Sequence, residues 1–423
     1  AWVVWNVFEV LLLFFLGLMW KINELCVNLR EINGTYRYCF MKYFLIAGEA
    51  SGDIHAAQII KALGENDSEA EFCFLGGDLM AKCAGCAPVI HYRDMAFMGF
   101  VEVIKHLPQI LRIMRKAKEL VRDFKPDAVI LVDYPSFNLK IARYAFELKI
   151  PVFYYISPKV WAWKEYRVKS IKKYVTRLYS ILPFEPAFFA KHDYEVKYVG
   201  NPSVSEIDEI LAKAPSQESF CVAHNLDASK PIISILPGSR RKEILNNLPE
   251  MLKATHSFPD YQVVISGAPG IEDKFYHTVI KTEGSYEIPP VVFDETYNLV
   301  KYSSASLVTS GTATLETAII GTPQVVCYRM NANKIVHSIF AHILKVKYVS
   351  LPNLIADAPI VPELLLHHCT KENISAMLEP LLVHSPKRDA MIEGYAVMRR
   401  ILGTNDSAKT AVIGMLKEIK SRK

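Results

Sequence analysis

The chain has 423 residues, more than one hydrophobic core usually supports, so we expect at least two domains. Hydrophobic residues make up 51% and charged residues 22%, a balance that excludes a disordered protein. The net charge of +5 is too small to predict a nucleic-acid-binding protein but suits anionic ligands or an anionic membrane surface. Cys83 and Cys86 have no second pair at zinc spacing, so we expect no metal site.

Residues 1–40 differ in composition from the rest of the chain. Residues 10–20 form an apolar run, which is marginal for a transmembrane helix of about 20 apolar residues. No basic segment precedes the run, as a signal peptide would require. Three interpretations stay open: a stretch that is not part of the functional protein, a membrane anchor, or a buried helix. We favour the first, and expect the chain from Met41 onward to be fully active.

Short apolar runs alternate with helical segments from residue 42 onward, a pattern typical of a doubly wound sheet of buried parallel strands. The first half contains five such runs, at 42–47, 71–76, 127–133, 152–157 and 177–183. After a polar crossing at 205–230, five more follow at 231–238, 262–267, 290–294, 305–311 and 324–328. The tail from about Lys371 is helical with no further strand. A first helix is expected from Asp53 to Leu63.

These runs predict an α/β protein with two Rossmann-like, doubly wound domains that face a central cleft. We expect four parts along the chain: an N-terminal extension outside the functional fold at 1–40, a first domain at 41–204, a second domain at 205–370, and C-terminal helices at 371–423 that can pack back on the first domain.

The motif G-E-A-S-G-D at 48–53 follows the first expected strand. Its glycines allow a sharp turn close to a ligand, and the next helix presents free N–H groups to an anion or a polar sugar. It is neither a Walker motif nor G-x-G-x-x-G. The alternative is a plain strand-to-helix turn with Ser51 or Asp53 as N-cap, which explains Glu49 less well. The candidate binding residues here are Gly48, Ser51, Gly52 and Asp53.

The motif L-P-G-S-R-R-K-E at 236–243 follows the first strand of the second half. Gly238 turns the chain, Ser239 can cap the next helix, and Arg240 lies where a diphosphate would bind the helix N-terminus. An arginine there suits a leaving diphosphate, whose negative charge grows in the transition state. The alternative, a solvent-exposed basic turn, better describes Arg241 and Lys242.

The motif S-G-T-A-T-L-E-T-A at 310–318 again predicts a strand, a glycine turn and a helix. Gly311 and Thr312 can place backbone amides near a phosphate. Glu316 lies one turn into the helix, where a carboxylate can accept hydrogen bonds from both hydroxyls of a ribose. The alternative is a first-turn glutamate that the helix dipole favours.

The motif L-V-D-Y-P-S-F-N at 131–138 ends a buried strand at Asp133, which should face the cleft. An aspartate there can remove a proton from an acceptor hydroxyl as that hydroxyl attacks a sugar carbon. A structural aspartate that caps the turn before Pro135 explains the motif equally well. Two weaker segments are S-P-K-V-W-A-W at 157–163, whose aromatic residues are core or line a sugar or lipid path, and S-L-P-N-L at 350–354, which places Asn353 in a loop.

Seven motifs in register resemble the lipid-A-disaccharide synthase family, from about Met41 to Pro362. They are G-E-A-S-G-D, M-G-F-V-E-V (98–103), D-Y-P-S-F-N, S-P-K-V-W-A-W, L-P-G-S-R, S-G-T-A-T-L-E and V-S-L-P-N-L. The resemblance implies the GT-B fold and an inverting transfer that needs no cofactor and no metal. A UDP-2,3-diacylglucosamine donor would meet a 2,3-diacylglucosamine 1-phosphate acceptor, giving the β-1,6-linked disaccharide 1-phosphate and UDP.

The resemblance also implies residue roles. The catalytic residues would be Asp133, Arg240 and Glu49, and either Asp133 or Glu49 would be the general base. Glu316 would bind the UDP ribose, and Asn353 would be the family's loop asparagine. The first domain would bind the acceptor and the second the UDP-sugar.

Because both implied substrates carry acyl chains, the enzyme would have to reach a membrane. Residues 159–177 carry seven basic residues against Glu165 alone, a face suited to anionic lipid. An apolar stripe could touch the membrane or the acyl chains, or pack in the core, and it contains Val103, Ile104, Leu107, Ile110, Leu111 and Met114. The implied location is the cytoplasmic face of the inner membrane, with no nucleic-acid partner; a homodimer stays open.

Two rival functions remain at this point. One is another GT-B enzyme that uses UDP-N-acetylglucosamine, such as a 2-epimerase or the transferase of peptidoglycan lipid synthesis. The other is a non-catalytic UDP-sugar-binding protein, which would have no need of a base such as Asp133.

Overall fold

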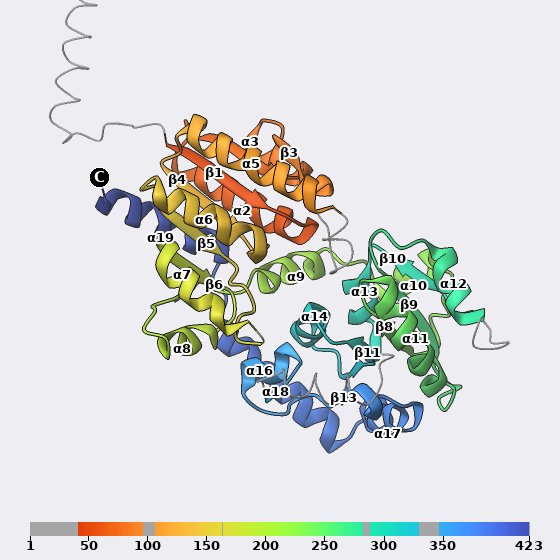
Figure 1. The fold of residues 1–423 in the computed structure, drawn as a ribbon. Helices are drawn as coiled ribbons and strands as arrows, with labels where there is room; N and C mark the ends of the chain where they lie inside the picture. Colours follow the sequence, from red (N-terminus) through yellow and green to blue (C-terminus); the bar gives the residue numbers. More distant parts are fainter. Residues whose placement is uncertain (1–40, 96–105, 163, 282–287, 330–346, 423) are drawn as a thin grey trace, which may run out of the picture.

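The structure is a computed structural model that describes residues 41–95, 106–162, 164–281, 288–329 and 347–422. It contains two parallel sheets, each covered by helices, and so confirms the predicted α/β class (Figure 1). The first sheet has the strand order β3-β2-β1-β4-β5-β6-β7, and the second has the order β10-β9-β8-β11-β12-β13. Residues 1–40 lie outside the described residues.

The strands of the first sheet are β1 (Lys42–Ala47), β2 (Glu71–Gly76), β3 (Ile90–His91), β4 (Ala128–Val132), β5 (Val152–Tyr155), β6 (Arg177–Ser180) and β7 (Lys197–Tyr198). The strands of the second sheet are β8 (Ile232–Leu236), β9 (Gln262–Gly267), β10 (Val291–Phe293), β11 (Ser303–Thr309), β12 (Gln324–Tyr328) and β13 (Glu363–Leu365). The central strands are fully buried, as their unbroken apolar sequences predict.

The helices of the first half are α2 (Ala50–Asn66), α3 (Asp78–Ala84), α5 (Leu107–Phe124), α6 (Pro135–Glu147), α7 (Val168–Tyr174) and α8 (Glu185–Ala190), with short 3₁₀ turns η1 (Tyr92–Asp94) and η2 (Glu165–Arg167). The later helices are α9 (Pro202–Ala212), α10 (Gln217–Ala223), α11 (Arg241–Thr255), α12 (Asp273–Lys281), α13 (Thr296–Lys301), α14 (Thr312–Ile320), α16 (Leu351–Ala356), α17 (Lys371–Leu382), α18 (Pro386–Leu402) and α19 (Ser407–Arg422), with η3 (Leu366–His368).

Each face of the first sheet has its own core. Because successive side chains of a strand point to opposite faces, alternate residues of β1 enter two separate clusters. One cluster joins Tyr43 and Leu45 to α2 and α19. The other joins Phe44 and Ile46 to α5, α6 and α7. The first domain is therefore a three-layer sandwich whose strands all point their carboxyl ends the same way.

The chain crosses between the two domains twice. The first crossing is α9, whose Val204 and Ile207 pack in the core of the second domain, so the boundary expected at 204/205 falls inside this helix. The second crossing follows α18, where Gly403 adopts a left-handed conformation and lets α19 return to the first domain.

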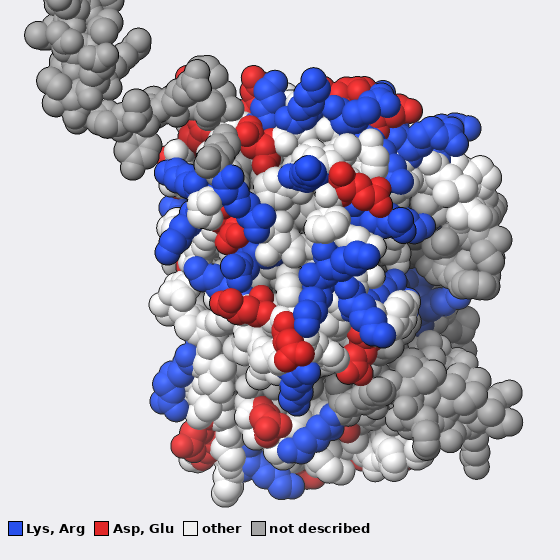
Figure 2. Space-filling view, turned by 60° about the vertical axis from the view of Figure 1, so that its left-hand side comes forward, with Lys and Arg blue, Asp and Glu red and all other residues white. Residues whose placement is uncertain are grey.

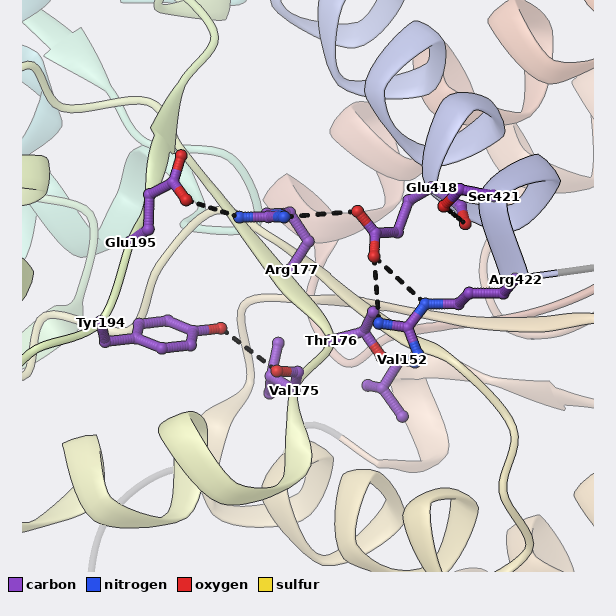
Figure 3. Close-up of polar contacts among 9 residues, drawn as sticks. All are labelled: Val152, Val175, Thr176, Arg177, Tyr194, Glu195, Glu418, Ser421 and Arg422. Atoms are coloured by element: carbon purple, nitrogen blue, oxygen red, sulfur yellow. Dashed lines mark hydrogen bonds and ion pairs between the residues drawn. The ribbon is translucent and has the colours of Figure 1, made fainter.

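The C-terminal helix α19 is fixed to the first domain by packing and by charge. It lies against α2 on one face of the first sheet (Figure 1). Its Glu418 accepts from Arg177 at 3.3 Å and from Arg422, while Arg177 also donates to Glu195 at 3.2 Å (Figure 3). At the other end of α19, the Ser407 and Tyr155 hydroxyls share a hydrogen bond of 2.8 Å.

Candidate active site at the interdomain cleft

A cavity of about 320 Å³ lies between the two domains, where strands from both sheets end. In open α/β sheets, ligands bind at this carboxyl edge. Five of the residues predicted from the sequence line the cavity: Ser51, Gly52, Asp133, Thr312 and Glu316. The cleft therefore brings together motifs from positions 48–53, 131–138 and 310–318 of the chain.

The first glycine loop is packed against the aspartate loop. A Cβ on Gly48 would lie 2.3 Å from the ring of Tyr134, so glycine alone fits there. The helix α2 begins at Ala50, three residues earlier than predicted, and Glu49 is its N-cap residue without a side-chain capping bond. The prediction of Ser51 or Asp53 as N-cap is therefore wrong, since both lie inside the first turn.

Asp53 caps a different helix. Its buried carboxylate accepts backbone N–H groups from Gly77 at 2.7 Å, Leu79 at 3.1 Å and Met80 at 3.2 Å, at the start of α3. The orphan donors of a helix N-terminus need such an acceptor. The structure thus gives Asp53 a structural contact and does not place it among the residues that line the cavity.

Asp133 lies in a strained turn at the end of β4. Asp133 and Tyr134 have φ values of 44° and 47°, a left-handed conformation that non-glycine residues adopt rarely. Two side chains hold this turn: Asn138 donates to the Asp133 carbonyl at 2.7 Å, and the Tyr154 hydroxyl donates to the same carbonyl. Strain maintained by dedicated hydrogen bonds is typical of functional sites. It fixes the Asp133 carboxylate at the cavity wall.

Burial and neighbouring charges shift the pKa values of two predicted catalytic residues, Asp133 and Glu49. Burial raises the pKa of Asp133, and the nearby ammonium of Lys159 opposes that rise. Burial also raises the pKa of Glu49, with the negative charge of Asp133 adding to it and the guanidinium of Arg240 opposing it. The charges of Asp133, in the same domain, and of Arg240, in the other domain, therefore both act on the carboxyl of Glu49.

Arg240 is presented by a tight loop before α11. Gly238 has a φ of 121°, and a Cβ there would lie 2.6 Å from Cβ of Glu243. Glu243 accepts from the Ser239 N–H at 3.0 Å and from the Arg240 guanidinium at 3.2 Å. The N-cap residue is Arg240 itself, so the predicted capping by Ser239 is wrong. The Arg240 side chain is 63% exposed.

Arg241 differs from its neighbour Arg240 in its surroundings. Its guanidinium lies 4.5 Å from the ring centroid of Phe275, a cation–π contact within the second domain. This contact gives Arg241 a local structural partner, whereas Arg240 interacts with Glu49 across the cleft.

Glu316 lies within α14, as predicted, and faces the cavity. Burial raises its pKa to about 7, and Glu206 adds to the rise, while the hydrogen bond that it accepts from the Tyr297 hydroxyl at 3.2 Å opposes it. A carboxylate of this kind, half ionised near neutral pH, can accept hydrogen bonds from vicinal hydroxyls.

Asn353 is buried at the start of α16, and its amide contacts only protein groups. It donates to the Val361 carbonyl and to Glu363 at 2.9 Å each, and accepts from the Val361 N–H at 2.9 Å. Glu363 also accepts the N–H groups of Val349 and Ser350. Asn353 thus holds the loop before α16 in place, and any effect on a substrate would act through that loop.

Several residues that line the cavity were not predicted as site residues from the sequence: His55, Lys159, Glu185, Glu206 and Tyr297. His55 and Glu206 carried no signal beyond their helical positions. Lys159 was assigned to the basic face at 159–177, but the structure places it on the cavity wall. Its position directly after β5, next to the end of β4, was the signal that could have identified it.

The residues expected to touch a membrane are described only in part. Val103, Ile104 and the M-G-F-V-E-V motif lie outside the described residues. Leu107 and Leu111, on the first turns of α5, are 46% and 49% exposed, whereas Met114 further along is buried. No helix among the described residues is long and apolar enough to cross a bilayer.

The two parallel-sheet domains and the cleft between them define a fold of the GT-B type. A UDP-GlcNAc 2-epimerase from Neisseria meningitidis, solved with UDP-GlcNAc, superposes with a TM-score of 0.60 over 89% of this chain and 100% of that one, at 16% identity. The calicheamicin glycosyltransferase CalG4 gives a TM-score of 0.55 at 15% identity, over 90% and 99% of the two chains. At these identities the likeness is one of fold alone.

The sequence comparisons identify the family. A family model described as lipid-A-disaccharide synthetase matches residues 43–409. The lipid-A-disaccharide synthase of Acidobacterium capsulatum is 37% identical over 381 residues, 87% of this chain and 93% of that protein. The synthase of Myxococcus xanthus is 36% identical, over 89% and 97%. The chain belongs to the lipid-A-disaccharide synthase family, as the seven motifs predicted, and is a hexosyltransferase of lipid A biosynthesis.

Proposed function

We propose that the chain transfers the sugar of UDP-2,3-diacylglucosamine to the 6-hydroxyl of 2,3-diacylglucosamine 1-phosphate, giving the β-1,6-linked disaccharide 1-phosphate and UDP. The observation that carries this proposal is electrostatic: Asp133, which lines the cleft cavity, and Arg240, from the opposite domain, both act through their charges on the carboxyl of Glu49. A base and a phosphate-binding cation on opposite sides of one cleft suit an in-line displacement at a sugar carbon.

Asp133 is proposed as the general base. Its carboxylate takes the proton of the acceptor 6-hydroxyl while that oxygen forms a bond to C1 of the donor. The C1–oxygen bond to the diphosphate breaks on the opposite face, and UDP leaves with the electron pair, so the configuration at C1 inverts. The raised pKa of Asp133 makes it a stronger base than an exposed aspartate.

Arg240 is proposed to bind the leaving diphosphate. Its guanidinium can bond to phosphate oxygens in a fork, and the negative charge on those oxygens grows as the bond breaks. This role supports a transfer that needs no metal ion, because Arg240 and the N-terminus of α11 supply positive charge. Glu49, between Asp133 and Arg240, is proposed to orient the guanidinium, and Glu316 to bind the ribose.

We further propose that the enzyme works at the cytoplasmic face of the inner membrane. The exposed Leu107 and Leu111 on α5 and the basic residues of α7, such as Lys169 and Lys173, support this location. Both helices pack on the same face of the first sheet. With the left-hand side of Figure 1 turned forward, Figure 2 shows that basic side chains predominate over acidic ones on the visible face.

The membrane proposal is tested by vesicle co-sedimentation. A variant with Leu107→Ser and Leu111→Ser should bind vesicles containing anionic lipid less than the wild type does, with unchanged thermal unfolding because both side chains are exposed. Unchanged vesicle binding by a folded variant would contradict the proposal.

The resemblance left a homodimer open, and sedimentation velocity would measure the oligomeric state.

The transfer itself is tested with purified protein and both acylated substrates. We expect UDP release and disaccharide formation in equal amounts, without added metal and in the presence of a chelator. Epimerisation at C2 of the donor, with no disaccharide, would instead favour the 2-epimerase function. Tight UDP binding with no product of either kind would favour a non-catalytic binding protein.

A further inference from the structure

Lys159 is a cation on the cavity wall that the proposed mechanism does not use. Its side chain is exposed and lines the cavity together with Asp133. Among the residues that the structure describes, its ammonium has no hydrogen-bond and no ion-pair partner. A lysine on the wall of a substrate cavity, with its three donors unused, is suited to an anionic ligand.

The loop that carries Lys159 is anchored on both sides of it. Ser157 before it is buried, and its hydroxyl donates to the Pro158 carbonyl at 3.1 Å. Val160 after it is buried in the core of the first domain. The Trp161 indole donates to the buried carboxyl of Glu185 at 2.9 Å. These contacts fix the backbone of Lys159 at the wall of the cavity that Asp133 also lines.

Glu185 anchors this loop but does not fully neutralise the positive charge of the Lys159 ammonium. Burial raises the pKa of Glu185 to about 8, so its carboxyl is largely protonated at neutral pH. The Ser180 hydroxyl and the Trp161 indole both donate to this carboxyl, and their hydrogen bonds oppose the rise in its pKa. The positive charge of Lys159 acts on Asp133 as well as on Glu185, and it is available to an anion that enters the cavity.

We propose that Lys159 binds the 1-phosphate of the acceptor and thereby selects a phosphorylated sugar. This inference rests on the proposed function, because it takes Asp133 as the position of the attacking 6-hydroxyl. In a glucosamine 1-phosphate, the carbons that carry the phosphate and the hydroxymethyl group flank the ring oxygen. The phosphate and the attacking hydroxyl thus lie on the same edge of the sugar, and a cation beside the base can reach the phosphate.

The donor diphosphate is the other phosphate that could reach the cleft. On the second domain, Arg240 and the N-terminus of α11 already supply positive charge for the donor diphosphate. Lys159 belongs to the first domain, in the loop that follows β5. Because the donor and the acceptor must approach from opposite sides of the reacting carbon, a cation on the side of the base serves the acceptor.

The test compares two acceptors, 2,3-diacylglucosamine 1-phosphate and the same sugar without the phosphate, at saturating donor. The wild type should prefer the phosphorylated acceptor in kcat/KM. Lys159→Met should raise KM for the phosphorylated acceptor by about tenfold or more, as expected for a lost charge-assisted hydrogen bond, and leave the other acceptor little changed. Lys159→Arg should keep most of the preference. The matched control is Lys417→Met, which removes an exposed lysine of α19 and should leave the preference unchanged.

Several outcomes would overturn the inference. One is a Lys159→Met variant that keeps the full preference for the phosphorylated acceptor. Another is a variant that loses affinity for UDP, measured by calorimetry, which would assign Lys159 to the donor. A third is a variant that only moves the acid limb of the pH profile of kcat, which would limit Lys159 to lowering the pKa of Asp133. A wild type that transfers to neither acceptor would overturn the proposed function itself.

Discussion

The two domains meet at one cleft but present their key residues in opposite ways. In the first domain, Asp133 lies in a strained turn that is held by hydrogen bonds from Asn138 and Tyr154 to the Asp133 carbonyl. In the second domain, Arg240 extends from a glycine turn and remains 63% exposed. The first arrangement fixes a base of raised pKa, while the second places an exposed cation where a phosphate can bind.

This difference matches what each group has to do. A general base must hold its position relative to one hydroxyl, and a small displacement lowers the rate strongly. A cation that follows a departing diphosphate must keep contact with oxygens that move. The comparison predicts that substitutions at the site residues of the first domain lower the rate of transfer with little change in UDP affinity. Substitutions at those of the second domain should lower both the rate and the UDP affinity.

The largest expected effect is that of Asp133→Asn. Removing a general base lowers kcat by about 100- to 10,000-fold. Asparagine tolerates the left-handed conformation, so the fold and the thermal unfolding should not change. The measurement is steady-state disaccharide formation. The matched control is Asp193→Asn, another left-handed aspartate of the same domain, whose side chain is 95% exposed. Full activity of Asp133→Asn, with activity lost instead in Glu49→Gln, would make Glu49 the base.

Arg240→Ala should have the next largest effect. We expect kcat to fall by about 100- to 1,000-fold, as for other groups that stabilise a developing charge, and UDP to bind more weakly. Arg240→Lys should recover only part of the rate because it cannot form a fork. Arg241→Ala is the control, since its guanidinium contacts Phe275. An equal loss in both variants would indicate a general effect of positive charge near the cleft.

Glu316→Gln should have a smaller effect, mainly on the donor. We expect KM for the UDP-sugar to rise by about tenfold, from weaker hydrogen bonds to the ribose. Because the pKa of Glu316 is raised to about 7, the carboxyl gains a proton as the pH falls below 7, so the wild-type KM for the donor should rise from pH 8 to pH 6. The Gln variant should show a flatter profile. A wild-type KM that is constant over this range would contradict the ribose role.

Asp53→Ala should have the smallest effect on chemistry. Loss of the carboxylate leaves the N–H groups of Gly77, Leu79 and Met80 without their acceptor and should lower the free energy of unfolding by about 1–3 kcal/mol. The folded fraction should keep its KM for both substrates. Asp78→Ala, with a side chain 73% exposed, is the control and should unfold nearly as the wild type does. A large rise in KM without loss of stability would indicate that Asp53 binds a substrate.

The sequence predicted the central strands well and the edge strands poorly. All ten expected strands are present, since buried parallel strands are continuous apolar runs. The strands β3, β7 and β13 were not predicted. Each has two or three residues and lies at a sheet edge, so pairing with a neighbour, rather than its own sequence, creates it.

The site was predictable where a motif lies at the carboxyl end of a strand. Asp133 and Glu316 face the cavity for this reason. Asp53 has the same motif signal and Asn353 was predicted from a weaker loop motif, but their side chains turn to α3 and to the loop before α16, because buried backbone groups there need a partner. Lys159 was assigned to the basic face because charge along the sequence does not distinguish a cavity wall from an outer face, and only its position after β5 pointed to the cavity.

The division of labour between the two domains is tested most directly by UDP titration of three proteins in a calorimeter. The wild type and Asp133→Asn should bind UDP with the same Kd, while Arg240→Ala should bind about tenfold or more weakly, because Arg240, and not Asp133, is proposed to contact the diphosphate. Equal weakening in Asp133→Asn and Arg240→Ala would contradict the account, since it would place both residues on the same substrate.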